Sequence, residues 1–416
     1  DPVVNTSTPC DFDLSTASSG DTIIIDCMMD LNGQTVNLPS NITIFYEGGD
    51  ITNGTLNFSD NSVISGELLN SSVTLSGSIP QLKDPTFNFD PTRWGIVEGK
   101  VSDAIALNNK TILNNVIALS KEMGVTTFKI DKMDAYFDVT AIGYATYPLA
   151  QSGILIPSNF ALIMTDNTFL RVQPNNSIAS SLLSLFKEEN ITVSGGNLIG
   201  DRYEHDYTPA TDLNGNIQYT HEFGMLIVVG GSQNIAIDNV NMSNASGDGI
   251  LVVGSRIRNE DGTVRDGETE SINISIKNSI IKDSRRNGMS LLDGSGMLVE
   301  NCKIINTGLG TNPDGVAHSS AGTWPKFGIC FEAISYIFSD GSVKIKRKIE
   351  NFVLRGNDFV NNAGGDVTLT LCSNITVENN HFVSMIGNVQ AKNLIIKDNT
   401  ATAKMNAHAP PGALAI

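Results

Sequence analysis

The sequence predicts an all-β fold, a parallel β-helix, because one short strand pattern recurs along the chain. Asn234-Ile-Ala-Ile-Asp-Asn is followed by Gly249-Ile-Leu-Val-Val, and Asn273-Ile-Ser-Ile-Lys-Asn is followed by Gly288-Met-Ser-Leu-Leu, with the same spacing from each first Asn to its Gly. Each unit offers two short strands of alternating apolar residues that end in Asn or Gly turns. Such strands bury their inner faces by stacking on copies of themselves.

Further copies begin at Asn190, Gly296, Asn351, Asn374 and Asn393. The last three starts follow one another closely, whereas the start at Gly296 is separated from the next by a much longer stretch. We interpret the short steps as bare coils and the long steps as coils that carry inserts on one side, where solenoids build their binding face. The expected inserts are 200–222, 254–271, 307–326 and 333–350. A leucine-rich repeat would need an L-x-x-L-x-L frame, and a β-sandwich would need sustained hairpin signals; the sequence has neither.

The chain before the inserts divides into short strands and one helix. Residues 1–90 alternate short apolar runs with Gly, Asn and Ser, which indicates narrow first rungs or a small cap, and 91–416 should form the main β-helix. Between Ser102 and Met123 the apolar residues follow helical spacing, and Gly124 can end the helix. We expect this helix, near 102–123, to cover the open end of the solenoid core.

Composition excludes some partners. Lys and Arg number 27 against 44 Asp and Glu, a net charge of −17, which argues against nucleic acid and anionic membranes. No apolar run is long enough to cross a bilayer, so we expect no membrane span. The first residue is not Met, which suggests a removed leader, and a Cys10–Cys27 disulfide would fit export. We therefore expect a secreted, periplasmic or cell-surface protein, in which Cys302, Cys330 and Cys372 are buried thiols.

A family resemblance supports the fold. The chain has a Trp94-Gly95 segment, one helix ending in Gly, an Ile156-Pro-Ser-Asn strand, and then Asn-Ile-x-Ile coils. This order resembles the pectate-lyase superfamily of right-handed β-helices, in the branch shared by polysaccharide hydrolases, phage tailspikes and uronan epimerases. The resemblance implies a right-handed solenoid and carbohydrate chemistry. The chain lacks the Gly-Asp-Gly-x-x-Asp-Asp of that branch before the helix, so no catalytic residue is carried over.

The coils can be aligned on the Gly that precedes each second strand: Gly224, Gly249, Gly288 and Gly328. Two residues before these positions stand Glu222, Gly247, Arg286 and Lys326. Strand alternation turns this column outward, with Gly247 leaving a gap where a sugar ring could approach. Asp248 lies one column over and would reach solvent only if a corner turned it out.

The outward column and the inserts supply the candidate site. The candidate catalytic carboxyl groups are Glu222, Asp248 and Glu332. The candidate substrate-binding residues are Arg202, His205, His221, Arg256, Arg285, Arg286, His318, Trp324 and Lys326. Arg and Lys hold carboxylate or sulfate groups, and Trp stacks on the apolar face of a sugar. The structural alternatives are an exposed ion-pair ladder for Glu222, Arg286 and Lys326, and a turn cap for Asp248.

Three functions remain open from the sequence. The first is a glycoside hydrolase that cleaves an anionic polysaccharide, sulfated or uronate-containing, with two carboxyl groups. The second is a polysaccharide lyase or uronan C5-epimerase, in which Arg286, Lys326 and His221 neutralise a uronate and move a proton. The third is a non-catalytic glycan-binding solenoid. No loop shows a dense series of metal ligands, so we assign neither a metal nor a cofactor.

Overall fold

The computed structural model describes residues 8–141, 152–212, 215–254, 269–310, 319–333, 335–337, 343–345, 348–384, 386–389 and 391–402. The chain forms two compact units, Asp1–Val97 with Thr111–Lys132, and Glu98–Lys110 with Met133–Ile416. We call them unit 1 and unit 2 and describe each by itself.

Unit 1 is a narrow solenoid of parallel strands. Thr22 pairs with Thr43, Thr43 with Val63, and Val63 with Gln81, so each short coil adds one strand to the same sheet. This sheet contains β1 (Thr22–Ile25), β4 (Thr43–Tyr46), β7 (Val63–Ile64) and β9 (Gln81–Leu82). The other parallel pairings join β2 (Met28–Asp30) to β5 (Asp50–Thr52), β3 (Thr35–Asn37) to β6 (Gly54–Phe58) and β8 (Val73–Gly77), and β10 (Thr86–Asn88) to β11 (Thr127–Ile130). Short helical turns are η1 (Leu14–Thr16), η2 (Gly66–Leu68) and α1 (Pro91–Trp94).

The cysteine prediction is confirmed. Cys10 and Cys27 form a disulfide across a Cα–Cα distance of 5.1 Å, while Cys302, Cys330 and Cys372 are free and buried. Burial raises the pKa of the Cys302 thiol to about 11. Such thiols carry little thiolate at neutral pH and act as small apolar side chains.

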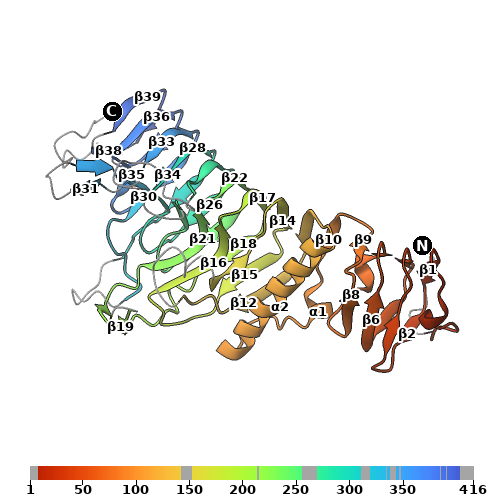
Figure 1. Ribbon diagram of the computed structural model, residues 1–416. Coiled ribbons are helices and arrows are strands. Elements are labelled where there is room, and N and C mark those ends of the chain that lie inside the picture. The colour runs from red at the N-terminus through yellow and green to blue at the C-terminus, as the bar shows by residue number, and fades with distance from the viewer. Residues whose placement is uncertain are drawn as a thin grey trace. The chain divides into compact units, whose positions relative to one another are not determined.

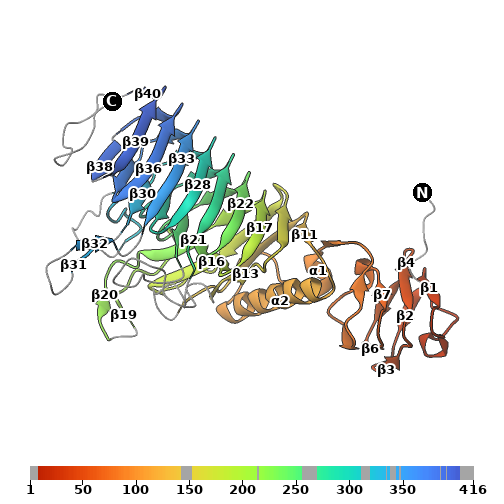
Figure 2. The ribbon, with the colours of Figure 1, turned by 45° about the horizontal axis from the view of Figure 1, so that its top comes forward.

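Unit 2 is a larger parallel β-helix with three sheets, as predicted (Figures 1 and 2). Within unit 2, sheet I contains β14 (Phe160–Met164), β17 (Glu189–Ser194), β22 (Gln233–Asp238), β25 (Ile272–Lys277), β28 (Gly294–Glu300), β33 (Ile349–Arg355), β36 (Cys372–Glu378) and β39 (Lys392–Lys397). Sheet II contains β12 (Met133–Phe137), β15 (Thr168–Val172), β18 (Asn197–Ile199), β23 (Asn241–Ser243), β26 (Ile280–Lys282), β29 (Lys303–Ile305), β34 (Asp358–Val360), β37 (His381–Phe382) and β40 (Thr400–Ala401). Sheet III contains β13 (Ile154–Leu155), β16 (Ala179–Phe186), β21 (Phe223–Gly230), β24 (Ile250–Val253), β27 (Met289–Leu291), β30 (Phe327–Glu332), β35 (Gly365–Thr370) and β38 (Ile386–Val389).

A ladder of asparagine side chains explains the recurring first residue of each coil. Asn234 has a φ of 55°, in the left-handed region that Asn tolerates better than most residues. Its Nδ2 donates to Asn190 Oδ1 at 2.9 Å, and its Oδ1 accepts from Asn273 Nδ2 at 3.1 Å. The same side-chain bond joins Asn374 to Asn351. Each ladder Asn therefore sets the backbone turn and fixes the register of its coil on the next.

We expect Asn234→Ala to lower the free energy of unfolding by about 2 kcal/mol. Alanine resists the left-handed region at a cost of roughly 1–2 kcal/mol and also loses the amide bonds, worth about 1 kcal/mol. Asn234→Gly is the matched control, because glycine adopts this φ freely and loses only the bonds. Urea unfolding followed by circular dichroism measures both variants; equal losses would contradict a role for backbone conformation.

The long helix α2 (Asp103–Glu122) confirms the helix predicted near 102–123. Gly124 ends it with a φ of 83°. Its first turns belong to unit 2, where Gln173 Nε2 donates to Asp103 Oδ1 at 2.9 Å and Asn109 Nδ2 donates to the Tyr136 carbonyl at 3.1 Å. Tyr136 lies in β12, so the start of α2 lies against the first coil of sheet II.

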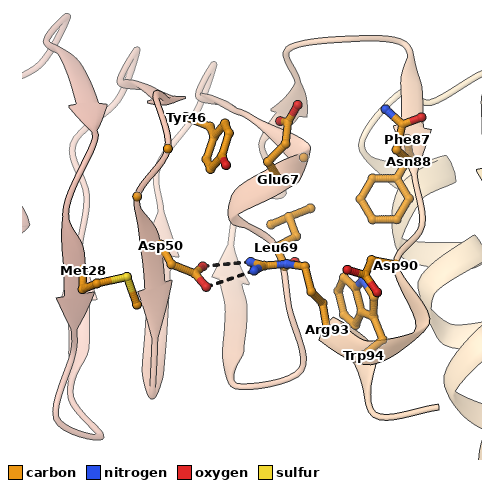
Figure 3. A pocket seen from close by; sticks show the side chains of 13 residues that line it. Met28, Tyr46, Asp50, Glu67, Leu69, Phe87, Asn88, Asp90, Arg93 and Trp94 are labelled. Atoms are coloured by element: carbon orange, nitrogen blue, oxygen red, sulfur yellow. Dashed lines mark hydrogen bonds and ion pairs between the residues drawn. The ribbon is translucent and has the colours of Figure 1, made fainter. Parts of the chain in front are cut away.

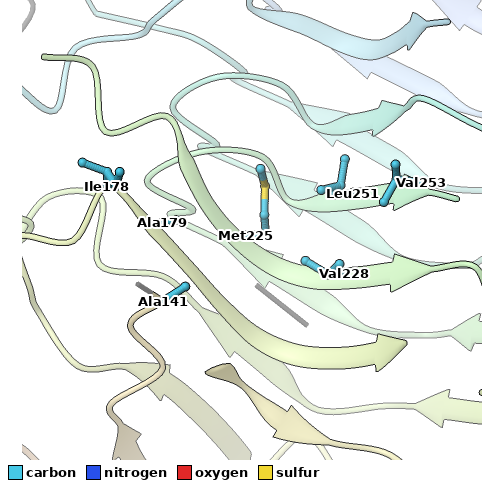
Figure 4. Packing of buried hydrophobic residues seen from close by; sticks show 7 residues of the cluster. All are labelled: Ala141, Ile178, Ala179, Met225, Val228, Leu251 and Val253. Atoms are coloured by element: carbon cyan, nitrogen blue, oxygen red, sulfur yellow. The ribbon is translucent and has the colours of Figure 1, made fainter. Parts of the chain in front are cut away.

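Sheet III has an inner and an outer face of different character. Phe331 contacts Phe352 of sheet I at 4.7 Å between ring centroids, so its column points into the core. Cys330 and Glu332 alternate with Phe331 and therefore point outward. On the earlier coils the outer face is apolar, and Met225, Val228, Leu251 and Val253 form a buried cluster with Ala141, Ile178 and Ala179 (Figure 4). The polar candidate residues therefore follow an apolar stretch of the same face.

The four inserts border sheet III. Inserts 200–222 and 307–326 join strands of sheet II to strands of sheet III, and the other two join sheet III to sheet I. Insert 200–222 contains the antiparallel pair β19 (Ala210–Thr211) and β20 (Ile217–Gln218), and insert 333–350 contains β31 (Ser335–Ile337) and β32 (Val343–Ile345). Most of insert 254–271 lies outside the described residues. The inserts thus adjoin the sheet whose outer face carries the candidate carboxyl groups.

Candidate functional site

Arg286 brings the three candidate catalytic carboxyl groups together. Its Nε lies 3.5 Å from Glu222 Oε2, its Nη1 lies 3.0 Å from Asp248 Oδ2, and its Nη2 lies 3.5 Å from Glu332 Oε2. Asp248 and Glu332 stand on coils two apart, yet both meet one guanidinium. The three carboxylates outnumber the single cation, so they favour its charged form and compete for its bonds.

Asp248 is fully buried and fully hydrogen-bonded. It has no exposed surface, and its Oδ1 accepts from the Asn287 N–H at 2.8 Å. Its Oδ2 accepts from Ser290 Oγ at 2.6 Å as well as from Arg286. The corner does turn this side chain to the outer face, but these bonds hold Arg286 and leave Asp248 without access to a substrate.

Glu222 and Glu332 are the accessible carboxyl groups of the cluster. Their side chains are 27% and 43% exposed, against 14% for Arg286. Burial raises the pKa of Glu222 above its ordinary value, and the nearby Asp248 and Glu332 carboxylates raise it further, while Arg286 and Arg285 oppose the shift. A carboxyl group with a raised pKa beside a more exposed one is the asymmetry that separates an acid from a base or nucleophile.

Arg202 and Arg285 fasten the inserts to the solenoid. Arg202 donates to the backbone carbonyls of Ser320 at 2.9 Å, Asp283 at 2.7 Å and Leu309 at 2.6 Å. Arg285 donates to the carbonyls of Ser319 at 2.9 Å, Ala321 at 3.1 Å and Thr220. Both arginines are buried, with 2% and 1% exposure, so their guanidinium groups position loops and do not face a substrate.

Histidines of the first insert form a buried chain next to Glu222. Asp201 Oδ2 lies 2.7 Å from His205 Nδ1, and His205 Nε2 lies 3.0 Å from His221 Nδ1. Tyr207 packs against His205 and lies 4.1 Å beneath the Arg285 guanidinium carbon. The sequence offered no signal for Tyr207, because it lies in an insert without strand periodicity. This network fixes the backbone from which Glu222 projects.

Trp324 is exposed in the described end of the third insert, and the half-buried Lys326 lies beside it. Trp324 is 73% exposed, and Lys326 Nζ lies 5.5 Å from the centroid of its ring. Met289 pairs with Ile329, so Lys326 stands one coil beyond Arg286, as the sequence alignment predicted. An exposed indole beside an ammonium group can stack on a sugar and hold an anionic substituent.

Two expectations about the column are wrong. Ile227, not Met225, pairs with Ile250, because the N–H groups of Leu226 and Ile227 both donate to the Gly249 carbonyl and shift the register. The expected sugar-sized gap at Gly247 is filled by backbone, since a Cβ there would lie 2.3 Å from the Glu222 carbonyl oxygen. Glu222 and Arg286 therefore meet directly across Gly247.

The remaining candidates are Arg256 and His318, which lie outside the described residues. In the part of the chain that the structure describes, no group of three or more His, Cys, Asp or Glu side chains could hold a metal ion. In that same part, no helix has the length and apolar character that crossing a bilayer requires.

Comparison with known proteins agrees with the architecture. Residues 214–407 match a family model described as a right-handed β-helix region. Two proteins of Bacillus subtilis (strain 168) are similar in sequence. Uncharacterized protein YclG is 32% identical over 299 residues, which cover 72% of this chain and 47% of that protein. The SPbeta prophage-derived uncharacterized protein YorA is 26% identical over 317 residues, or 76% and 50%. The chain spans about half the length of these relatives.

Solved structures with the same type of fold are distant in sequence. The tailspike protein gp49 of Acinetobacter baumannii bacteriophage Fri1, a capsular polysaccharide depolymerase, is 12% identical with a TM-score of 0.43, over 78% of this chain and 63% of that one. An iota-carrageenase complexed to iota-carrageenan fragments is 12% identical with a TM-score of 0.44, over 74% and 58%. The chain folds as a right-handed, pectate-lyase-like β-helix.

Proposed function

We propose that this protein is a glycoside hydrolase that cleaves a polysaccharide, with Glu222 and Glu332 as its two carboxyl groups. The observation that carries the proposal is the pair of accessible carboxyl groups on one half-buried guanidinium, one of them with a raised pKa. Because both contact the same planar group, their oxygens are at most roughly 9 Å apart, which does not exceed the ~9.5 Å upper limit for glycosidases.

The roles follow from the surroundings of each group. Glu222 is half-buried and holds its proton more firmly, so it donates a proton to the glycosidic oxygen. Glu332 is the more exposed carboxylate and acts as the nucleophile or as the base that activates water. Arg286 and Asp248 position both groups. The sequence had indicated Asp248 as a catalytic candidate, and we assign it this positioning role instead.

Contacts at the exposed insert support the substrate class. Trp324 offers a ring face to a sugar, and Lys326 beside it can pair with the carboxylate or sulfate of an anionic polysaccharide. Arg286 is already surrounded by carboxylates and is not assigned this task. The Cys10–Cys27 disulfide supports a place in an oxidising compartment outside the cytosol.

The lyase alternative finds less support. A lyase needs a cation to neutralise the uronate and an accessible base to remove its proton. Arg286 is occupied by three carboxylates, and His221 is buried against His205. Lys326, beside the exposed Trp324 ring, is the candidate cation that remains to neutralise a uronate.

A panel of sulfated, uronate-containing and neutral polysaccharides tests the proposal. We expect new reducing ends without a rise in ultraviolet absorbance, because hydrolysis leaves no double bond in the product. The Glu222→Gln/Glu332→Gln double variant is the control and should release none. An unsaturated product that absorbs ultraviolet light would contradict hydrolysis and support the lyase; turnover by the double variant would remove these carboxyl groups from the mechanism.

A further inference from the structure

Unit 1 carries a cleft made of two adjoining cavities. Their volumes are about 460 Å³ and about 240 Å³, and Tyr46, Gly66, Glu67 and Asn88 line both. The larger one is within the size range of small-molecule sites, roughly 300–1,000 Å³. All residues that line it belong to unit 1, so the cleft is separate from the carboxyl cluster of unit 2.

Successive coils place the lining side chains in two rows. Tyr46 ends β4, Glu67 lies in η2 after β7, and Asn88 ends β10, so these three follow the solenoid axis. Figure 3 shows them along one side, with the Asp50–Arg93 pair and Trp94 along the other. A cleft that runs across coils suits an extended chain of repeating units.

The side of the cleft that carries Asp50 and Arg93 is polar, but the two charges neutralise each other. Arg93 Nη1 and Nη2 contact Asp50 Oδ2 and Oδ1 at 2.9 and 2.8 Å, and Arg93 Nε donates to the Leu69 carbonyl at 3.3 Å. The hydrogen bond with Asp50 raises the pKa of Arg93, so its guanidinium stays charged. The edges of this ion pair present donor and acceptor atoms in one plane and in a fixed arrangement.

Aromatic side chains supply apolar surface. Tyr46 is 38% exposed, and Trp94 is half-buried with its ring held edge-on to Phe87 at 6.3 Å. Such rings can cover the C–H face of a sugar while neighbouring polar groups bind its hydroxyls. Asn88 offers both a donor and an acceptor, which a hydroxyl can use at once.

The charges select the ligand class. The lining carboxylates are Asp50, Glu67, Asp84 and Asp90, against the cations Arg93 and Lys83. This excess of negative charge repels an anionic chain. Three of these carboxylates already have partners: Asp50 pairs with Arg93, Asp90 Oδ1 accepts from the Thr92 N–H at 2.9 Å, and Asp84 Oδ1 accepts from the Thr86 N–H at 2.8 Å. An organic cation would therefore meet Glu67 alone, which suits a single hydroxyl contact better than a cation site.

We propose that this cleft of Tyr46, Glu67, Asn88, Trp94 and the Asp50–Arg93 pair binds an uncharged oligosaccharide. The site would hold the protein on a neutral glycan whether or not unit 2 hydrolyses its own substrate. The proposal therefore stands apart from the carboxyl cluster and can fail or hold independently of it.

Tryptophan fluorescence tests the site directly, because the chain contains two tryptophans, Trp94 and Trp324. In the Trp324→Phe variant of the whole chain, Trp94 is the sole tryptophan reporter. We expect a saturable change on titration with one of the neutral gluco-, manno-, xylo- or galacto-oligosaccharides, and none with oligouronates. In the Trp94→Phe variant, Trp324 reports on the exposed insert of unit 2, so binding there is distinguished from binding in the cleft.

Matched variants complete the experiment in the Trp324→Phe background. Tyr46→Ala and Glu67→Gln should weaken binding at least tenfold. Phe12→Ala and Glu47→Gln should leave binding unchanged, because neither residue lines the cleft. Phe12 matches Tyr46 in exposed fraction, at 39% against 38%. The absence of a saturable change with every neutral sugar, unaltered binding in Tyr46→Ala, or a response to spermidine or choline instead would overturn the proposal.

Discussion

Replacing Glu222 with glutamine should lower kcat about 10²–10⁴-fold, the usual contribution of a general acid. Glutamine keeps the shape of the side chain and its place beside Arg286 but has no proton to donate. Glu332→Gln should lose a comparable factor, because it removes the second carboxylate. Initial rates on the polysaccharide identified by the panel measure both effects, and circular dichroism verifies that the fold is intact.

The pH profile gives Glu222 a second, independent signature. Its pKa is raised by burial and by neighbouring carboxylates, so the alkaline limb of kcat/KM should lie above the ordinary range of a glutamate. The residual activity of Glu222→Gln should lack that limb. Glu189→Gln, an exposed glutamate at the start of β17, is the matched control and should keep both rate and profile. A normal rate in Glu222→Gln would exclude it as the acid.

The second large effect is on stability. We expect Arg286→Met to lower the free energy of unfolding by about 3–5 kcal/mol, the cost of leaving a buried charge without its partner. Asp248 has no exposed surface and would lose its cation. Glu222 and Glu332 would then face Asp248 across the space that the guanidinium leaves. Chemical denaturation of the chain and its variant measures the loss.

Arg355→Met is the matched control for Arg286→Met. Arg355 also contacts two carboxylates, Glu300 at 2.6 Å and Glu378 at 3.6 Å, but its side chain is 43% exposed. An exposed ion pair contributes at most about 1 kcal/mol, so this variant should lose little. Adding Asp248→Asn to Arg286→Met should restore part of the stability, because it removes the unpaired charge. Equal losses in the two methionine variants would show that burial of the cluster is not the cause.

The coils were predictable because their turns require particular residue types. A left-handed turn selects Asn or Gly, so Asn234, Asn273 and Gly296 identify the coil starts, and their φ values of 55°, 57° and 69° confirm why. The register at Gly249 was not predictable, because an irregular pairing of Leu226 and Ile227 with one carbonyl selects no particular residue type.

The site was predictable in its members but not in their roles. Alternation placed Arg286 on the outer face, but only tertiary structure shows that Glu222, Asp248 and Glu332 converge on it. Arg202 and Arg285 looked like substrate ligands because cationic side chains in loops often are. Their partners are backbone carbonyls, which every residue carries. No residue pattern could therefore distinguish an arginine that holds a loop from one that binds a substrate.

The asparagine ladder has a consequence for how such a protein can change over evolution. Its side-chain bonds join coil starts that are close together along the chain, as Asn374 and Asn393 are, and coil starts that are far apart, as Asn190 and Asn234 are. The spacing along the chain therefore does not matter to the stack, and segments between rungs can be lengthened, shortened or exchanged while the scaffold keeps its dimensions. We expect transplanted inserts to be accepted wherever both flanking asparagines are retained, which makes the solenoid a frame on which new specificities can be assembled piece by piece.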